Sequence, residues 1–287
     1  MEPVKPENTS EPFDWEVLGK NIDEQLRKGF PRLSVIIPTY NCAQWMGITL
    51  NSIISQRYGG DGIEVVVVDA SSSDRTVEVV GSYYDLNVRI YSVKRYNVHE
   101  MLNRGISLAS GKYITIMFPG DFYVSYDALA YMAQTALDDN FPDVIYCGCL
   151  LHDGEGEAFT LFRPLSKTIL VKGQQPTSLQ SCWFKITTIK SLGKFNARYS
   201  LRAALDLFCR IHFNKDIRVK GLRRILLDYE GRRMNYHTVA THFVETLHIV
   251  YHYFGLIKAV RWVFIQKDFR RLMCLLLRRC RSAFLRR

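Results

Sequence analysis

The chain has 287 residues, of which 47% are hydrophobic and 13% aromatic, and this composition excludes a disordered protein. Its seven cysteines include no CxxC pair, which argues against a disulfide framework and against a cysteine zinc site. The formal net charge of +10 lies mostly in residues 255–287, so the sequence indicates a local electrostatic contact and not a nucleic-acid-binding protein.

Residues 1–32 are mostly polar, without the apolar core of a signal peptide, and we expect a polar N-terminal extension. No stretch approaches the roughly 20 apolar residues that span a bilayer. The sequence therefore predicts a protein that starts in the cytoplasm and stays there.

Residues 33–150 alternate apolar runs with segments of helical periodicity. Runs rich in Val and Ile at residues 33–39, 62–69, 88–94, 112–118 and 142–151 predict strands, because such runs fit strands covered on both faces. Helical spacing between them, as at Met46, Leu50, Ile53 and Ile54, predicts a doubly wound α/β sheet that is mostly parallel.

Polar residues follow three of these strands. Pro38, Thr39 and Tyr40 end the first, Asp69 ends the second, and Pro119-Gly120-Asp121 follow the fourth. Ligands bind at the carboxyl ends of strands in such sheets, so this edge is the predicted binding site.

Residues 151–235 are less regular. They contain a short apolar run at 158–164, a helical segment at 200–213 and a further apolar run at 224–230. From Tyr236 onward the chain has helical periodicity, interrupted by Gly255.

Four motifs resemble, in order and spacing, glycosyltransferase family 2 of the GT-A fold. They are LSVIIPTYN (33–41), EVVVVDASSSDRT (64–76), LNRGISLASGKYITIMFPGD (102–121) and SLGKFNARYSLRAALDLFCRI (191–211). The resemblance implies a nucleotide-sugar-binding half at 33–150, an acceptor-side half at 151–235 and C-terminal helices at 236–287. It also implies a hexosyltransferase-type activity that inverts the sugar's configuration.

The resemblance implies that the donor nucleotide, most often uridine diphosphate in this family, contacts the residues that follow the first two strands. These are Pro38, Thr39, Tyr40, Asn41, Asp69 and Ser71, with Asn103 on the third helix and Gly120 beside the phosphates. A carboxylate such as Asp69 can accept a hydrogen bond from a ring N–H of the base. The alternatives stay open: Asp69, Thr39 and Ser71 also suit turns or helix caps, and Asn103 suits a polar surface.

Asp121 is the predicted metal ligand. Family members often carry a D-x-D-D turn, whereas this chain has Phe118-Pro119-Gly120-Asp121 and keeps one acid. Mg²⁺ or Mn²⁺ retains several waters and takes one or two carboxylates plus substrate phosphates, so one acid can suffice for an ion held weakly without donor. The alternative is that Asp121 caps a following helix.

Asp206 matches the acidic position of the acceptor-side motif, and the resemblance implies that it deprotonates the acceptor hydroxyl. The alternative is a helix N-cap.

The apolar residues of 269–284 fall at helical spacing, with arginines on the other faces. This pattern is typical of a basic amphipathic helix that lies in a membrane interface. We therefore expect residues 255–287 to bind an anionic membrane surface on the inner face of the cell membrane. The acceptor would then be a membrane-proximal or lipid-linked saccharide, as in surface-polysaccharide biosynthesis.

Two alternatives remain at this stage. The missing acids also suit a protein of the same fold that binds nucleotide sugar without turnover. A nucleotidyltransferase is disfavoured, because PTYNCAQW after the first strand lacks a Gly-rich phosphate loop with a basic residue.

Overall fold

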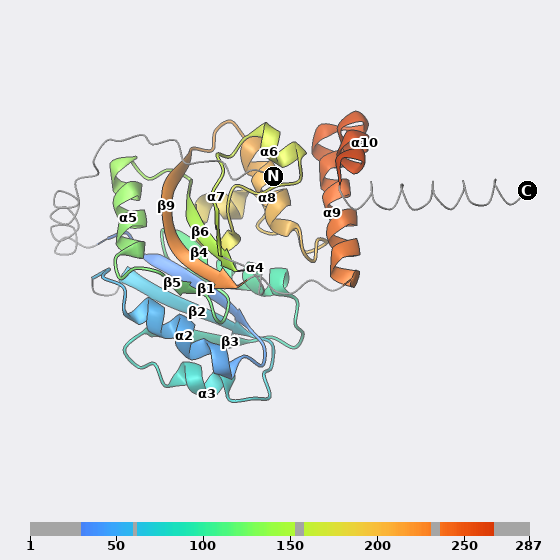
Figure 1. The fold of residues 1–287 in the computed structure, drawn as a ribbon. Coiled ribbons are helices and arrows are strands. Elements are labelled where there is room, and N and C mark those ends of the chain that lie inside the picture. The colour runs from blue at the N-terminus through green and yellow to red at the C-terminus, as the bar shows by residue number, and fades with distance from the viewer. Residues whose placement is uncertain (1–29, 60–61, 153–157, 231–235, 267–287) are drawn as a thin grey trace, which may run out of the picture.

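The computed structural model describes residues 30–59, 62–152, 158–230 and 236–266 (Figure 1). Its strands are β1 (Leu33–Thr39), β2 (Ile63–Asp69), β3 (Asn87–Ser92), β4 (Tyr113–Ile116), β5 (Phe122–Tyr123), β6 (Val144–His152), β7 (Phe159–Leu161), β8 (Cys182–Lys185) and β9 (Val219–Glu230). Its α-helices are α2 (Ala43–Ile54), α3 (Thr76–Gly81), α4 (Val98–Leu108), α5 (Ala128–Asp138), α6 (Lys167–Val171), α7 (Ile186–Ser191), α8 (Ala203–Phe213), α9 (Tyr236–Phe254) and α10 (Leu256–Ile265), and a 3₁₀ turn, η2, covers Leu179–Ser181.

The strands form one sheet in the order β3-β2-β1-β4-β8-β6-β9-β5, with β7 beside β6. The strands β3, β2, β1 and β4 are parallel, and so are β6 and β9, whereas β8 runs antiparallel between β4 and β6. The predicted mostly parallel α/β sheet is confirmed. The four-residue strand β8, which the sequence did not predict, makes the sheet continuous between residues 33–150 and the segment that follows.

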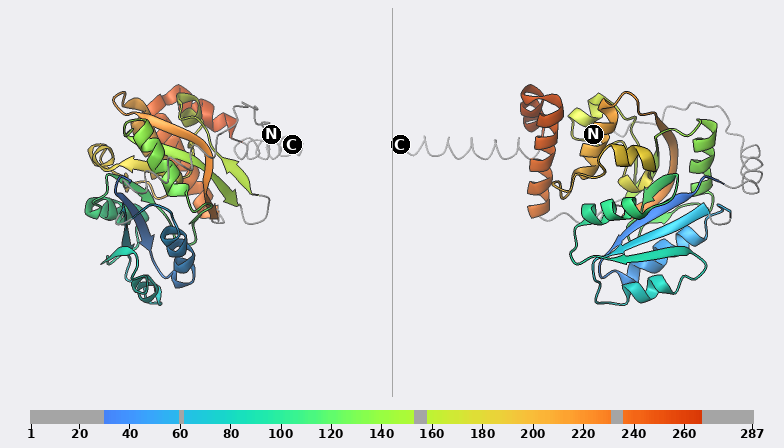
Figure 2. Two further views of the ribbon diagram at one scale, coloured as in Figure 1. Left: turned by 90° about the vertical axis from the view of Figure 1, so that its left-hand side faces the viewer. Right: turned by 180° about the vertical axis from the view of Figure 1, so that it is seen from behind.

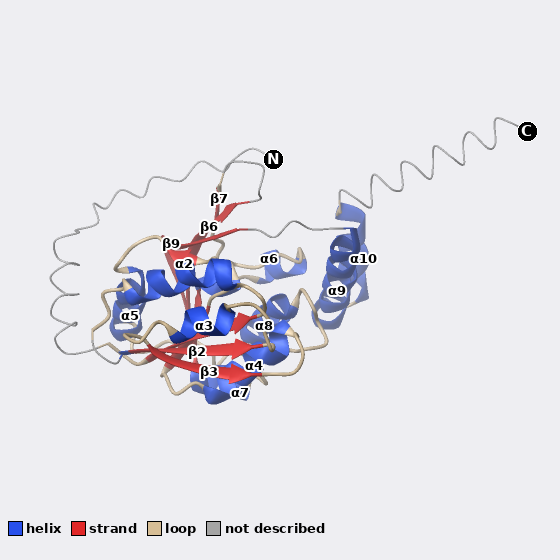
Figure 3. Cartoon of the chain, turned by 90° about the horizontal axis from the view of Figure 1, so that it is seen from below, coloured by secondary structure: helices blue, strands red, loops and turns tan. Residues whose placement is uncertain are grey.

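Helices cover both faces of the sheet, as the predicted doubly wound arrangement requires (Figure 3). Successive side chains of β1 alternate between two cores: Val35 and Ile37 pack with α2 and α5, and Ile36 packs with α4 and α8. Because side chains alternate along a strand, a continuous apolar run supplies both cores at once.

Apolar spacing sets the buried face of helix α2, and a side-chain cap begins helix α4. In α2 the predicted residues Met46, Leu50 and Ile53 are buried, whereas the predicted Ile54 is 39% exposed because it lies at the edge of the apolar face. The side chain of Asn97 caps α4 by accepting from the backbone N–H groups of His99 and Glu100. This cap fixes the first turn of α4 at the carboxyl-terminal edge of the sheet.

Helices α9 and α10 stand beside α6 and α8 at one end of the molecule (Figures 1 and 2). They are separated at Gly255, whose φ of +82° is favourable only for glycine. The indole of Trp262 in α10 donates to the Lys172 carbonyl at 3.0 Å, which fixes α10 to the body of the protein.

No helix among the described residues is both long and apolar enough to cross a bilayer. Within the predicted membrane-contacting segment, α10 exposes Ile257 and Phe264 together with the cations Lys258 and Arg261. The predicted amphipathic helix at 269–284 lies outside the described residues.

Candidate active site

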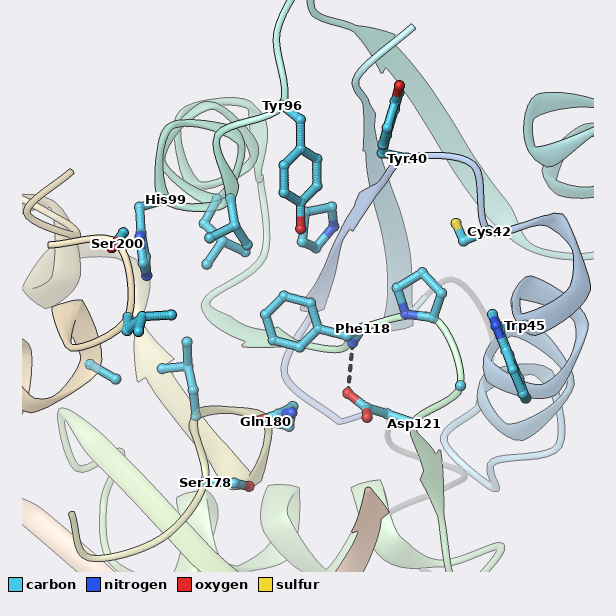
Figure 4. Close-up of a pocket in the computed structure, with 18 of the residues that line it drawn as sticks. Tyr40, Cys42, Trp45, Tyr96, His99, Phe118, Asp121, Ser178, Gln180 and Ser200 are labelled. Atoms are coloured by element: carbon cyan, nitrogen blue, oxygen red, sulfur yellow. Dashed lines mark hydrogen bonds between the residues drawn. The ribbon is translucent and has the colours of Figure 1, made fainter. Parts of the chain in front are cut away.

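A cavity of about 870 Å³ opens at the carboxyl ends of β1 and β4 (Figure 4). Its donor-side wall comes from the segment after β1, the first turns of α2 and α4, and the turn after β4. The opposite wall comes from η2 and from the residues around the start of α8, among them Ser178, Gln180, Ser200, Leu201 and Ala204. This is the edge of the sheet at which the sequence predicted a ligand site.

The turn after β4 carries the predicted metal ligand. Asp121 is 5% exposed, and its carboxylate accepts from the Phe118 backbone N–H at 2.7 Å (Figure 4). Gly120 adopts a φ of +101°, and its N–H donates to the Thr49 hydroxyl at 2.9 Å. Thr49 in turn donates to the Asp121 carbonyl at 2.9 Å, so α2 fixes the turn with Asp121 against the cavity.

The cavity offers one protein carboxylate as a ligand for a divalent ion. Asp121 is the one carboxylate among the described residues that line this cavity, and the described residues contain no cluster of three or more His, Cys, Asp or Glu side chains around a common point. One carboxylate is compatible with Mg²⁺ or Mn²⁺ when substrate phosphates and water complete the coordination. The site therefore fits an ion that arrives with the donor.

Thr39 and Asp69 lie side by side, because β1 and β2 pair in register at their last residues. The buried Asp69 carboxylate accepts from the Thr39 hydroxyl at 3.0 Å, the Ser72 N–H at 2.8 Å and the Ser72 hydroxyl at 2.5 Å. A carboxylate has about four acceptor positions, so one remains for a ligand N–H. Neither Thr39 nor Asp69 lines the cavity directly.

Asn41 and Ser71 organise the loops that surround this pair. The Asn41 side-chain oxygen accepts from the Ser73 N–H at 2.8 Å, and the Asn41 N–H donates to the Ser72 hydroxyl at 2.9 Å. The Ser71 hydroxyl donates to the Val93 carbonyl at 2.9 Å. Both residues link neighbouring loops, whereas Pro38 and Tyr40 line the cavity itself.

Asn103 does not line the cavity. Its side-chain amide donates to the Phe195 carbonyl at 2.8 Å and accepts from the Phe195 N–H at 2.9 Å. This reciprocal pair links α4 to the loop that precedes α8.

Asp206 lies in the first turn of α8 and lines a neighbouring cavity of about 670 Å³. One of its carboxylate oxygens accepts from the Tyr253 hydroxyl at 2.9 Å, and the other forms an ion pair with Arg210 at 2.8 Å. The structure thus separates Asp206 from the cavity that contains Asp121. Its assignment as the base stays a prediction.

Several cavity residues were not predicted. The rings of Tyr40 and Tyr96 lie 5.7 Å apart at one side of the opening, and Trp45 faces it from α2. His99, at the start of α4, lies beside Ser200 at the other side (Figure 4). The one available signal was their position near the predicted strand at 88–94: Tyr96 lies in the loop after it, and His99 lies at the start of the helical segment that follows.

Comparison with known proteins places this geometry in context. The family model described as glycosyl transferase family 2 matches residues 34–194. The PGL/p-HBAD biosynthesis glycosyltransferase of Mycobacterium bovis is 26% identical over 205 residues, which are 69% of this chain and 77% of the relative. An uncharacterized glycosyltransferase of Rickettsia typhi is also 26% identical over 205 residues, covering 67% of this chain and 64% of the relative.

Solved structures share the fold at low identity. The S. aureus TarS fragment 1–349 in complex with UDP superposes with a TM-score of 0.62 at 18% identity, covering 83% of this chain and 70% of that one. The mannosyltransferase PcManGT from Pyrobaculum calidifontis, in complex with GDP-Man and Mn²⁺, gives a TM-score of 0.56 at 19% identity and covers 91% and 86%.

Proposed function

Since the chain belongs to glycosyl transferase family 2, we propose that it transfers a sugar from a nucleoside-diphosphate sugar to a saccharide acceptor. The observation that carries the proposal is the cavity at the carboxyl ends of β1 and β4, with the buried Asp121 carboxylate and the Gly120 backbone at its edge. A negatively charged diphosphate needs a backbone that comes close to it and a cation that balances its charge. Gly120 supplies the close backbone, and Asp121 supplies a ligand for the cation.

The donor nucleotide would lie along the wall formed by Pro38, Tyr40 and Tyr96. The Asp69 carboxylate accepts three hydrogen bonds from Thr39 and Ser72. We propose that its remaining acceptor position takes a ring N–H of the base. We propose uridine as the base, in keeping with the UDP complex of the TarS fragment, and the GDP-Man complex of PcManGT makes guanosine the alternative.

In the proposed reaction the acceptor hydroxyl attacks the anomeric carbon opposite the departing diphosphate, which inverts the configuration. A divalent ion, when bound with Asp121, would supply Lewis-acid neutralisation of the leaving diphosphate. The protein's own residues hold the donor and accept the acceptor's proton. The sequence predicts Asp206 as the base, but Tyr253 and Arg210 engage its carboxylate, and Asp206 lines the neighbouring cavity.

We further propose that the acceptor is membrane-proximal or lipid-linked, as in polysaccharide assembly, and that the protein acts peripherally on the inner face of the cell membrane. The exposed side chains Ile257 and Phe264, beside Lys258 and Arg261, support this proposal. Charge reversal of Lys258 and Arg261 should reduce flotation with anionic liposomes, whereas equal flotation of variant and wild type would refute this contact.

Calorimetric titration with UDP, with and without Mn²⁺, tests the donor site. Wild type should bind UDP more tightly with Mn²⁺, and Asp121→Asn should lose that gain because it removes the ion's one protein carboxylate. Asp85→Asn, at an exposed acid outside the cavity, is the matched control. Equal Mn²⁺ dependence in wild type and Asp121→Asn would refute the role of Asp121.

A second candidate is a nucleotide-sugar-binding protein without turnover. The observation that favours it is that Asp121 is the one carboxylate lining the described part of the cavity. Tight donor binding with neither transfer nor hydrolysis would establish this alternative.

A further inference from the structure

His99 occupies the wall of the cavity on the first turn of α4. Its side chain faces the cavity beside Ser200, and the residue is 7% exposed (Figure 4). The Asn97 cap fixes the backbone of this turn, and the Phe195 ring lies 6.1 Å from the imidazole. The imidazole is therefore held in place by its surroundings.

The imidazole of His99 has no hydrogen-bond partner among the described residues, although its backbone N–H binds Asn97. Its ring nitrogens are not among the fully buried polar atoms that lack a partner in the described residues, so they are accessible from the open cavity. A ligand in the cavity can therefore form a hydrogen bond with the imidazole.

Burial lowers the pKa of His99 below its ordinary value of 6.5, and the Glu245 carboxylate on α9 opposes this shift only partly. At neutral pH the imidazole is therefore uncharged, and one ring nitrogen has a free lone pair. In this state a histidine accepts a proton instead of donating one to the cavity.

His99 lies on the side of the cavity from which the acceptor hydroxyl would attack the sugar. In Figure 4 it lies across the cavity from Asp121, next to residues of the wall that includes Ser200. A base that activates the attacking group in an inverting sugar transfer acts on the face opposite the leaving group. If the diphosphate lies at Asp121, that face is turned toward His99.

No carboxylate among the described residues competes for this role at the same wall. Helix α8 contributes Ala204 to the cavity, and Asp206 faces the neighbouring one. Glu245 already accepts from the N–H groups of Ser200, Leu201 and Arg202 and from the Ser200 hydroxyl. His99 is the proton acceptor that remains.

We propose that His99 is the general base of this enzyme, an inference that rests on the proposed glycosyl transfer. The acceptor's oxygen forms a bond to the anomeric carbon while its proton passes to the imidazole. The bond from the anomeric carbon to the diphosphate oxygen breaks, and its electron pair leaves with the nucleoside diphosphate. The Glu245 carboxylate stabilises the resulting imidazolium electrostatically.

The test uses release of nucleoside diphosphate from UDP-GlcNAc and from GDP-mannose in the presence of Mn²⁺, with water as the acceptor. Wild type, His99→Gln, His99→Ala and Asp206→Asn are compared across pH. His212→Gln is the matched control, since this histidine lines neither this cavity nor the one that contains Asp206. UDP or GDP binding by calorimetry reports separately on the integrity of the donor site.

We expect His99→Gln to lower kcat about 10²- to 10⁴-fold with nucleotide affinity unchanged. The wild-type rate should be full at neutral pH and fall only below pH 6.5, because the neutral imidazole is the active form and its pKa is lowered. This fall in rate at low pH, the acid limb of the pH profile, should be absent in His99→Gln and present in Asp206→Asn. Added imidazole should partly restore His99→Ala, which a structural role alone would not explain.

The assignment of His99 as the base would be overturned if His99→Gln kept the rate and pH profile of the wild type. It would also be overturned if Asp206→Asn lost the fall in rate at low pH. Absence of nucleotide release by the wild-type protein would overturn the proposed function and this inference with it. Normal release by His99→Gln would overturn the inference alone.

Discussion

Glu245 connects α9 to the acceptor-side wall of the cavity, and its replacement by glutamine tests that connection. The carboxylate accepts from the backbone N–H groups of Ser200, Leu201 and Arg202 at 2.7, 3.0 and 2.9 Å, and from the Ser200 hydroxyl at 2.8 Å. These groups directly precede α8, so a negative charge there also complements the helix dipole.

Glutamine preserves the shape of the side chain. Its carbonyl oxygen can accept hydrogen bonds from two of the four donor groups, whereas its NH₂ group would lie against the other two and cannot accept from them. A hydrogen bond to a charged group contributes about 1.5–3 kcal/mol, and water can replace part of it at the exposed Ser200 and Leu201. We therefore expect Glu245→Gln to lower the free energy of unfolding by about 2–3 kcal/mol at pH 7. For a chain of this size that corresponds to a Tm lower by about 4–12 °C.

The pH dependence gives the sharper result. Burial raises the pKa of Glu245, but hydrogen bonds from Leu201, Ser200 and Arg202 outweigh it and bring the pKa below its ordinary value of 4.5. A lowered pKa means that the stabilisation is complete above pH 4.5 and is lost as pH falls through the folded value. Thermal unfolding of wild type and variant should therefore differ at pH 7 and converge in acid.

Glu100→Gln, at an exposed glutamate on α4, is the matched control and should change stability by at most about 1 kcal/mol. An equal destabilisation by Glu245→Gln at pH 7 and in acid would refute the reasoning, and so would a stability unchanged at pH 7.

Three further predictions concern Glu64, Gly120 and Tyr253. Glu64 is fully buried and pairs with the partly exposed Arg89 at 2.6 Å, so Glu64→Gln should cost about 1.5–3 kcal/mol in denaturant unfolding, and an unchanged stability would contradict this. Gly120→Ala should weaken UDP binding about 5- to 100-fold, because alanine is strained by about 1–3 kcal/mol at a φ of +101°, and wild-type affinity in calorimetry would argue against it. Tyr253→Phe should lower stability by about 1–3 kcal/mol in thermal unfolding, since the Asp206 carboxylate loses a donor at 2.9 Å, and an unchanged Tm would show that water replaces it.

The strands and the site edge were predictable from the sequence because their signals are local. A run such as residues 63–69 buries both faces, and its apolar side chains show this without knowledge of its neighbours. The position of Asp121 after such a run likewise placed it at the cavity.

Features that depend on distant partners were not predictable. The strand β8 has four residues and is defined by its pairing with β4 and β6 on either side. Asp206 is held by Tyr253, which lies 47 positions later, and Asn103 by Phe195, which lies 92 positions later. His99 resembles any polar residue near a helix start, and its burial comes from segments that meet it only in the folded chain.

The turn that holds Asp121 is completed by the short strand β5, whose partner is β9. Phe122 pairs with Asp228, about a hundred positions later in the chain. At a synthesis rate of about 5–20 residues per second, that partner leaves the ribosome roughly 5–20 s after Asp121. During this interval the nascent protein has strands β1 to β4 but an open sheet edge beside the turn that carries Asp121. The proposed donor site would therefore be completed late in translation, and a truncated product that ends before β9 would lack the strand that supports this turn.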